Sequence, residues 1–128
     1  MKPVNQKASR ILSKLIALAD ESPTRHVRIA NNDTFMAVIV ERIFENRVSV
    51  AHYGEQNGDL MADPEMEFYI GADGRFYPCT FRNDYTAYYR KSIEFSDGKP
   101  LGVYRREQAD QASFAGTWME NIRQQQNL

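Results

Sequence analysis

Acidic side chains gather around one histidine between residues 52 and 67. The set comprises His52, Glu55, Asp59, Asp63, Glu65 and Glu67. Carboxylates and imidazole are ligands for Mg²⁺, Mn²⁺ or Zn²⁺, so this segment could serve a metal-dependent hydrolase or nuclease. Asp59, Asp63, Glu65 and Glu67 are its candidate ligands. Their spacing fits no HExxH or EF-hand motif, and Tyr69 stands where a nuclease core would carry lysine. The competing interpretation is a set of turn and exposed strand residues.

Two further side chains could take part in covalent or acid–base chemistry. His52 alternates with Val48 and Val50, so it is either an exposed general base or a hydrogen-bonded residue inside the fold. Cys79 is predicted to lie on the core face opposite Phe68 as a small buried hydrophobe, since no basic residue is placed to lower its pKa. No GxSxG, P-loop or GxGxxG motif occurs, so the sequence predicts no cofactor and gives little support for an enzyme.

Aromatic residues are unevenly distributed, with most of them between residues 68 and 104. Tyr85, Tyr88 and Tyr89 lie close to Arg82 and to the basic pair at residues 90 and 91. Aromatic and basic side chains on a sheet can stack unpaired bases of single-stranded nucleic acid. The same residues are enriched at protein interfaces, and a third interpretation is that they only pack on the sheet.

The richest concentration of turn-forming residues falls at 54–64, which we expect to be a long and functional loop. Together with the polar segment that begins at residue 82, it supplies the predicted contacts to a partner or ligand. These are His52, Tyr53, Glu55, Gln56, Asn57, Asp59, Asp63, Arg82, Asp84 and Tyr85.

The composition indicates one globular domain that spans residues 1–128. The net charge of −1 argues against a general nucleic-acid binder, although residues 31–76 carry nine acidic and three basic side chains. A single cysteine excludes an internal disulfide. No apolar run approaches the roughly 20 residues of a membrane helix, and no signal peptide is evident, so we expect a cytoplasmic protein without membrane contact.

The elements that would position these residues follow from periodicity. Apolar spacing predicts a helix over residues 4–19 and a second over 107–125, with strands between 25 and 105. Pro3 suits the first turn of the first helix, and the polar tail at 124–127 is expected to fray. Tight turns between strands predict an antiparallel sheet of four to six strands, with both helices packed on one face in a two-layer α+β sandwich.

Two predictions about strands are more specific. Asp73-Gly74 predicts a two-residue turn, which would pair Phe68 with Cys79 and Met66 with Phe81. Pro78 cannot donate a ladder hydrogen bond, so its strand is expected to be bulged or near an edge. Residues 85–95 are predicted as one strand and 101–105 as a short return strand. An exposed strand at 85–95 could pair with its copy in a homodimer.

The run at residues 49–68, SVAHYGEQNGDLMADPEMEF, resembles an uncharacterised bacterial domain family carried on plasmids, integrative conjugative elements and other mobile DNA. The segments 28–31 and 82–85 and the spacing of Phe114, Trp118, Asn121 and Gln125 also resemble that family. The resemblance implies a genetic context and no particular reaction, cofactor or catalytic residue. Accessory roles in plasmid maintenance, transfer or interference with host defence would suit that context.

These observations favour a non-enzymatic accessory protein that binds a protein partner. A metal-dependent hydrolase that uses residues 52–67 is the second hypothesis. The third is a single-stranded nucleic-acid binder that uses the Tyr/Arg-rich segment at 82–91.

Overall fold

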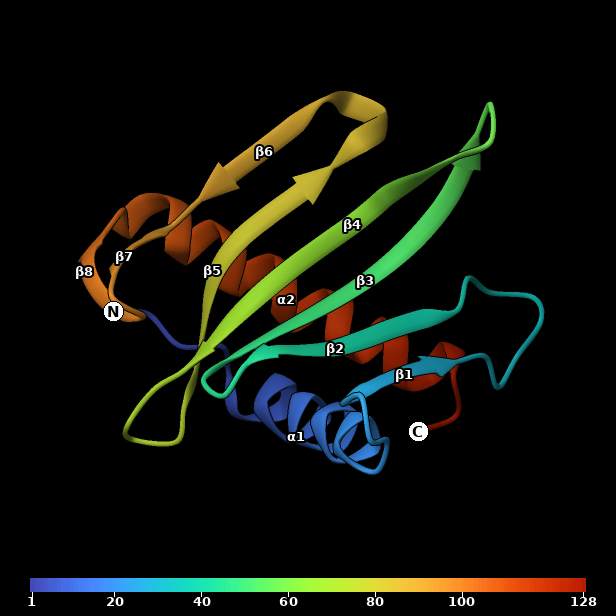
Figure 1. Ribbon diagram of the computed structural model, residues 1–128, viewed down its shortest axis with the longest axis horizontal. Coiled ribbons are helices and arrows are strands. Elements are labelled where there is room, and N and C mark those ends of the chain that lie inside the picture. The colour runs from blue at the N-terminus through green and yellow to red at the C-terminus, as the bar shows by residue number, and fades with distance from the viewer.

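The protein is a two-layer α+β structure, as predicted; the computed structural model describes residues 1–128 (Figure 1). Six antiparallel strands form a sheet in the sequential order β1-β2-β3-β4-β5-β6, and β7 pairs with β8 in a separate two-stranded sheet. The elements are α1 (Gln6–Asp20), β1 (His26–Ile29), β2 (Val38–Phe44), β3 (Arg47–Gln56), β4 (Asp59–Ile70), β5 (Phe76–Asn83), a 3₁₀ turn η1 (Asp84–Thr86), β6 (Tyr88–Lys91), β7 (Ile93–Ser96), β8 (Lys99–Val103) and α2 (Arg105–Gln125). Both helices lie on one face of the large sheet.

The main core lies between the helices and this face of the sheet. Helix α1 buries the predicted apolar stripe, including Leu12 and Leu15, against residues of β2, β3 and β4 such as Val50 and Phe68. The helix begins later than predicted because the side chain of Asn5 accepts a hydrogen bond from the backbone N–H of Ala8 and caps the first turn.

The expected long loop at 54–64 is instead a hairpin, so that prediction was wrong. Strand β3 continues to Gln56, and β4 begins at Asp59. Asn57 and Gly58 form the two-residue turn between them, and both have positive φ angles, 53° and 85°. Asn-Gly is a favoured pair for such a turn because these residues tolerate the left-handed conformation. The segment 52–63 is therefore part of a hairpin, with a register shift between Ala51 and Tyr53 and a short exposed tip.

The β4–β5 hairpin has the predicted register only in the half that lies far from its turn. Met66 pairs with Phe81 as predicted, but Phe68 pairs with Pro78 and not with Cys79. The register shifts at a bulge beside Pro78, which confirms the expected irregularity there. Consequently Cys79 does not face Phe68. It is buried in a second small cluster with Tyr77 and Ile93, on the face opposite the main core.

Residues 85–95 do not form one strand, which corrects another prediction. The chain makes the 3₁₀ turn η1, runs along β5 as β6, and then leaves the large sheet at Ser92. Ser92 is fully buried, and its hydroxyl donates to the carbonyl oxygen of Pro78 at 2.7 Å. Beyond it, β7 pairs with β8 through a turn at Asp97 and Gly98. Strand β8 occupies 99–103, and residue 105 already begins α2.

The C-terminal tail is held in place at Gln126, which was expected to fray. Gln126 is fully buried, and its side-chain oxygen accepts from the backbone N–H of Asn31 at 2.8 Å. Its amide nitrogen donates to the carbonyl oxygen of Met36 at 3.1 Å. The end of α2 is thus tied to the loop between β1 and β2. Neither helix combines the length and apolar character that spanning a bilayer would require.

Candidate functional site

The two polar segments singled out in the sequence do lie together. The carboxylate of Asp84 accepts from the backbone N–H of Ala62 at 2.8 Å, and the side-chain amide of Asn83 donates to Asp63 at 3.1 Å. Tyr85 lies against Gly54 so closely that no Cβ would fit beneath its hydroxyl. These contacts fasten η1 to the β3–β4 hairpin, so Asp63, Asp84 and Tyr85 have structural partners.

His52 faces the helices and is not an exposed base. It is 7% exposed, its Nδ1 lies 3.0 Å from the carbonyl oxygen of Ala37, and its ring meets Trp118 edge-on at 5.6 Å between centroids. Burial raises the pKa of the Cys79 thiol to about 12, so this cysteine is protonated at neutral pH and a poor nucleophile. Both residues contribute to packing.

The candidate metal ligands are dispersed. Glu65 accepts from the Tyr53 hydroxyl at 2.7 Å, whereas Glu67 pairs with Arg47 at 2.6 Å. Burial and the Glu65 carboxylate raise the pKa of the Tyr53 hydroxyl, so Tyr53 remains a donor. Asp59 is exposed at the hairpin tip. No three His, Cys, Asp or Glu side chains of the chain gather in an arrangement that could hold a metal ion.

The hairpin tip itself presents Glu55, Gln56, Asn57 and Asp59 to solvent. A pocket of about 650 Å³ lies beside it, lined mainly by the loop and strands at residues 26–41. Of the predicted contact residues, only Tyr53 lines that pocket. The predicted site is therefore not organised around a shared cavity.

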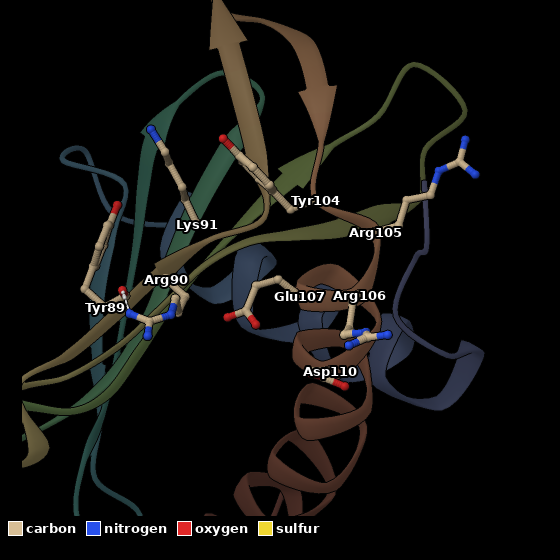
Figure 2. A pocket seen from close by; sticks show the side chains of 8 residues that line it. All are labelled: Tyr89, Arg90, Lys91, Tyr104, Arg105, Arg106, Glu107 and Asp110. Carbon is tan, nitrogen blue, oxygen red and sulfur yellow. Dashed lines mark hydrogen bonds between the residues drawn. The ribbon is translucent and has the colours of Figure 1, made fainter.

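A different corner of the molecule has open space and uncommitted charge. A pocket of about 690 Å³ lies between β6 and the first turns of α2 (Figure 2). Tyr89, Arg90 and Lys91 line it from β6. The α2 side is formed by Tyr104, Arg105, Arg106, Glu107 and Asp110, and Figure 2 shows Arg105 extending away from the others.

The bulge in β5 positions this corner. The carbonyl oxygen of Pro78 accepts from Ser92 and also from the buried side-chain amide of Gln108 at 3.1 Å. The backbone N–H of Tyr104 donates to the carbonyl oxygen of Ser92 at 2.8 Å. Because one irregular point of the sheet anchors both the end of β6 and the start of α2, the space between these elements is fixed.

The charges at this corner are only partly neutralised. Lys91 pairs with Glu94 at 2.8 Å, which raises the pKa of its ammonium group. Arg105 and Arg106 form no ion pair, and neither does Asp110. The two arginines stand at the positive end of a 21-residue helix, where Tyr104 supplies no side-chain cap. An anionic group is favoured beside them.

A second pocket of about 260 Å³ adjoins the first and shares Glu107 and Asp110 with it. Its other walls are Phe81, Tyr88, Gln111 and Phe114. We call the two pockets together the β6–α2 groove. The groove is cationic near the start of α2 and aromatic further along the helix.

The tyrosines of β6 do not form one stacking platform. The Tyr88 ring meets Phe81 edge-on at 5.7 Å, on the face that packs against the helices. Side chains alternate along a strand, so Tyr89 points to the opposite face, where it pairs across from Arg82. Tyr85 lies apart from both, over Gly54.

Sequence reasoning missed the α2 side of the groove because the helix was interpreted only as a cover for the sheet. One signal was available. Arg105 and Arg106 place two positive charges in the first turn of a helix, where the helix dipole favours acidic residues. This unfavourable pair, only partly offset by Glu107 in the same turn, was the signal that could have drawn attention to the start of α2.

The fold and groove define a small α+β domain with a mixed-charge surface groove. A family model described as Domain of unknown function (DUF6908) matches residues 6–128, and the chain therefore belongs to this family. No curated protein and no solved structure gives a match.

Proposed function

We propose that the protein is a non-enzymatic binding module that holds an extended segment of a partner protein in the β6–α2 groove. The observation that carries the proposal is the groove itself, in which unpaired Arg106 and Asp110 flank one open pocket between an edge strand and a helix. Charged groups without partners are available to a ligand, whereas those around Asp84 are already used.

The mixed charge of the groove favours a protein over a nucleic acid. Glu107 and Asp110 line both pockets and would repel a phosphate backbone. Exposed aromatic residues and arginine are enriched at protein interfaces. A partner segment with acidic groups near Arg106 would complement the cationic end.

Strand β6 offers main-chain groups as well. It is the last strand of the sheet, and all four of its residues are exposed. The Ser92 N–H donates to the carbonyl oxygen of Cys79 in β5 at 2.8 Å, and Arg90 pairs with β5 in the same register. Bonded pairs alternate along an antiparallel ladder, so the main-chain groups of Arg90 face β5 and those of Tyr89 and Lys91 face the free edge. An extended partner segment could bond to these free groups.

The resemblance of residues 49–68 supports a genetic context for this module. On that basis we propose that it is an accessory protein of bacterial plasmids, integrative conjugative elements or related mobile DNA. The partner would then be a protein of the element or of its host cell.

Selection of a random peptide library on the purified protein tests the binding function without knowledge of the partner. We expect enriched peptides that carry acidic residues and whose Kd rises by about tenfold or more in Arg106→Glu. The matched control is Lys14→Glu, a charge reversal on the exposed face of α1. Peptides that bind both variants equally would place the binding surface elsewhere, and a library without enrichment would refute the module.

A further inference from the structure

The aromatic end of the β6–α2 groove has perpendicular ring walls. Phe81 stands at its centre and meets Tyr88 at 79° and Phe114 at 85°, with ring centroids 5.7 and 5.0 Å away. Phe114 and Tyr88 are both more than one third exposed. All three rings line the pocket, and the π faces of aromatic rings attract cations.

The other walls of this pocket carry two carboxylates that have no cationic partner. Neither Glu107 nor Asp110 forms an ion pair within the chain, although both lie one turn apart on α2 and line the pocket. Only the side-chain amide of Gln111, 3.4 Å away, donates to Glu107. Two carboxylates beside aromatic rings are suited to a cationic ligand.

Gln111 supplies a third acceptor. It is 3% exposed, and its amide nitrogen faces two acceptors, the Arg90 carbonyl and the Glu107 carboxylate. Since both neighbours accept hydrogen bonds, the nitrogen must face them, and the orientation of the amide is fixed. Its oxygen is consequently buried without any donor. A buried polar atom without a partner is costly, so a ligand that brings a donor would be favoured.

We infer that the aromatic end of the groove binds the guanidinium group of an arginine side chain. A guanidinium is planar, stacks on aromatic rings and carries five N–H donors, whereas an ammonium offers a single compact charge. The chain already shows one such contact, since the guanidinium of Arg90 lies 4.8 Å from the centroid of the Tyr88 ring. Arg90 forms no ion pair, so the carboxylates of Glu107 and Asp110 stay free for the incoming group.

The source of the arginine rests on the proposed function, because the groove is proposed to hold a segment of a partner protein. The partner segment would then carry an acidic group toward Arg106 and an arginine toward Phe114. The pocket can still be tested alone, with small probes that do not depend on the partner.

The probe is Nα-acetylarginine amide, titrated into the ¹⁵N-labelled protein and followed by NMR. We expect saturable shifts at the Gln111 side-chain amide and around Phe114, with no such shifts from the neutral isostere Nα-acetylcitrulline amide. Nα-acetyllysine amide should bind several-fold more weakly. Equal effects of the citrulline or the lysine probe would overturn the guanidinium assignment, as would a lack of saturable shifts.

Substitutions separate the pocket from the rest of the surface. The double variant Glu107→Gln/Asp110→Asn should weaken the arginine probe by about tenfold. Glu55→Gln, on the exposed hairpin tip, is the matched control and should have no effect. Unchanged binding by the double variant contradicts the inference. If the arginine probe binds while the peptide library yields nothing, the pocket stands and the partner-binding function fails; the reverse result refutes the pocket alone.

Discussion

Two polar regions of this molecule differ in what their side chains are bonded to. At the junction of the β3–β4 hairpin with η1, Asp63, Asp84 and Tyr85 contact the neighbouring chain segment directly. In the β6–α2 groove, Arg106 and Asp110 have no ion-pair partner. The junction is rich in polar residues because it joins strands that would otherwise end in unpaired groups. The groove has similar residue types, but they are uncommitted.

The comparison teaches that a dense set of polar residues does not by itself identify a binding site. Bonded polar groups stabilise the fold, and their loss lowers the free energy of unfolding. Unpaired surface charges add little stability and remain free for a ligand. Substitutions in the two regions should therefore have opposite consequences.

The largest effect is expected at the junction. Asp84→Ala leaves the Ala62 N–H without its acceptor and removes the pairing with Arg82 at 2.7 Å. We expect the free energy of unfolding to fall by about 1–3 kcal/mol in urea denaturation. Asp59→Ala, at the exposed tip of the same hairpin, should change it by less than about 0.5 kcal/mol. If both substitutions changed the free energy of unfolding equally, the hydrogen-bonded Asp84 would contribute no more to stability than the exposed Asp59.

A smaller effect, of opposite sign, is expected in the groove. Arg106→Glu replaces a cation with an anion at the start of α2, so it should raise the free energy of unfolding by about 0.3–1 kcal/mol, measured in urea at low salt. The same substitution should weaken the selected peptides. A variant that gains stability and loses binding would show that Arg106 serves a ligand. Loss of stability would instead assign it a structural role.

The smallest effect concerns pH. The Ala62 N–H donates to Asp84, and Arg82 lies beside it, so the pKa of this carboxyl is lowered. A lowered folded pKa means that the stabilisation is complete above the unfolded value of about 3.9 and is lost as pH falls through the folded value. Between about pH 6 and pH 3, Asp84→Asn should lose less stability than the unmodified protein. A parallel loss in both would show that this carboxylate contributes nothing to acid sensitivity.

Much of the fold could be predicted from local sequence patterns. The apolar stripe of α1, the turns at Glu45-Asn46 and Asp97-Gly98, and the sequential antiparallel order all follow from residues close together in the chain. Asn57-Gly58 is also a residue pair that favours a tight turn, but the surrounding polar residues and Pro64 led to the prediction of a long loop. The bulge beside Pro78 was foreseen, whereas its effect on the register, and hence on Cys79, was not.

The groove could not be predicted from the sequence, for a physical reason. Its walls come from β5, β6 and α2, and Phe81 and Phe114 meet only because α2 folds back over the sheet. Whether Asp84 or Asp110 has a partner is likewise decided by tertiary contacts. Residue type and spacing do not determine it.

The central claim is that the β6–α2 groove, and not the hairpin tip, receives the partner. The direct test places a photo-reactive amino acid at Tyr88, which lines the groove and is 38% exposed, or at Leu60, which is 73% exposed, and irradiates each protein with a selected peptide. Crosslinking at position 88 and none at position 60 is the predicted result. Crosslinking at position 60 alone would contradict the claim.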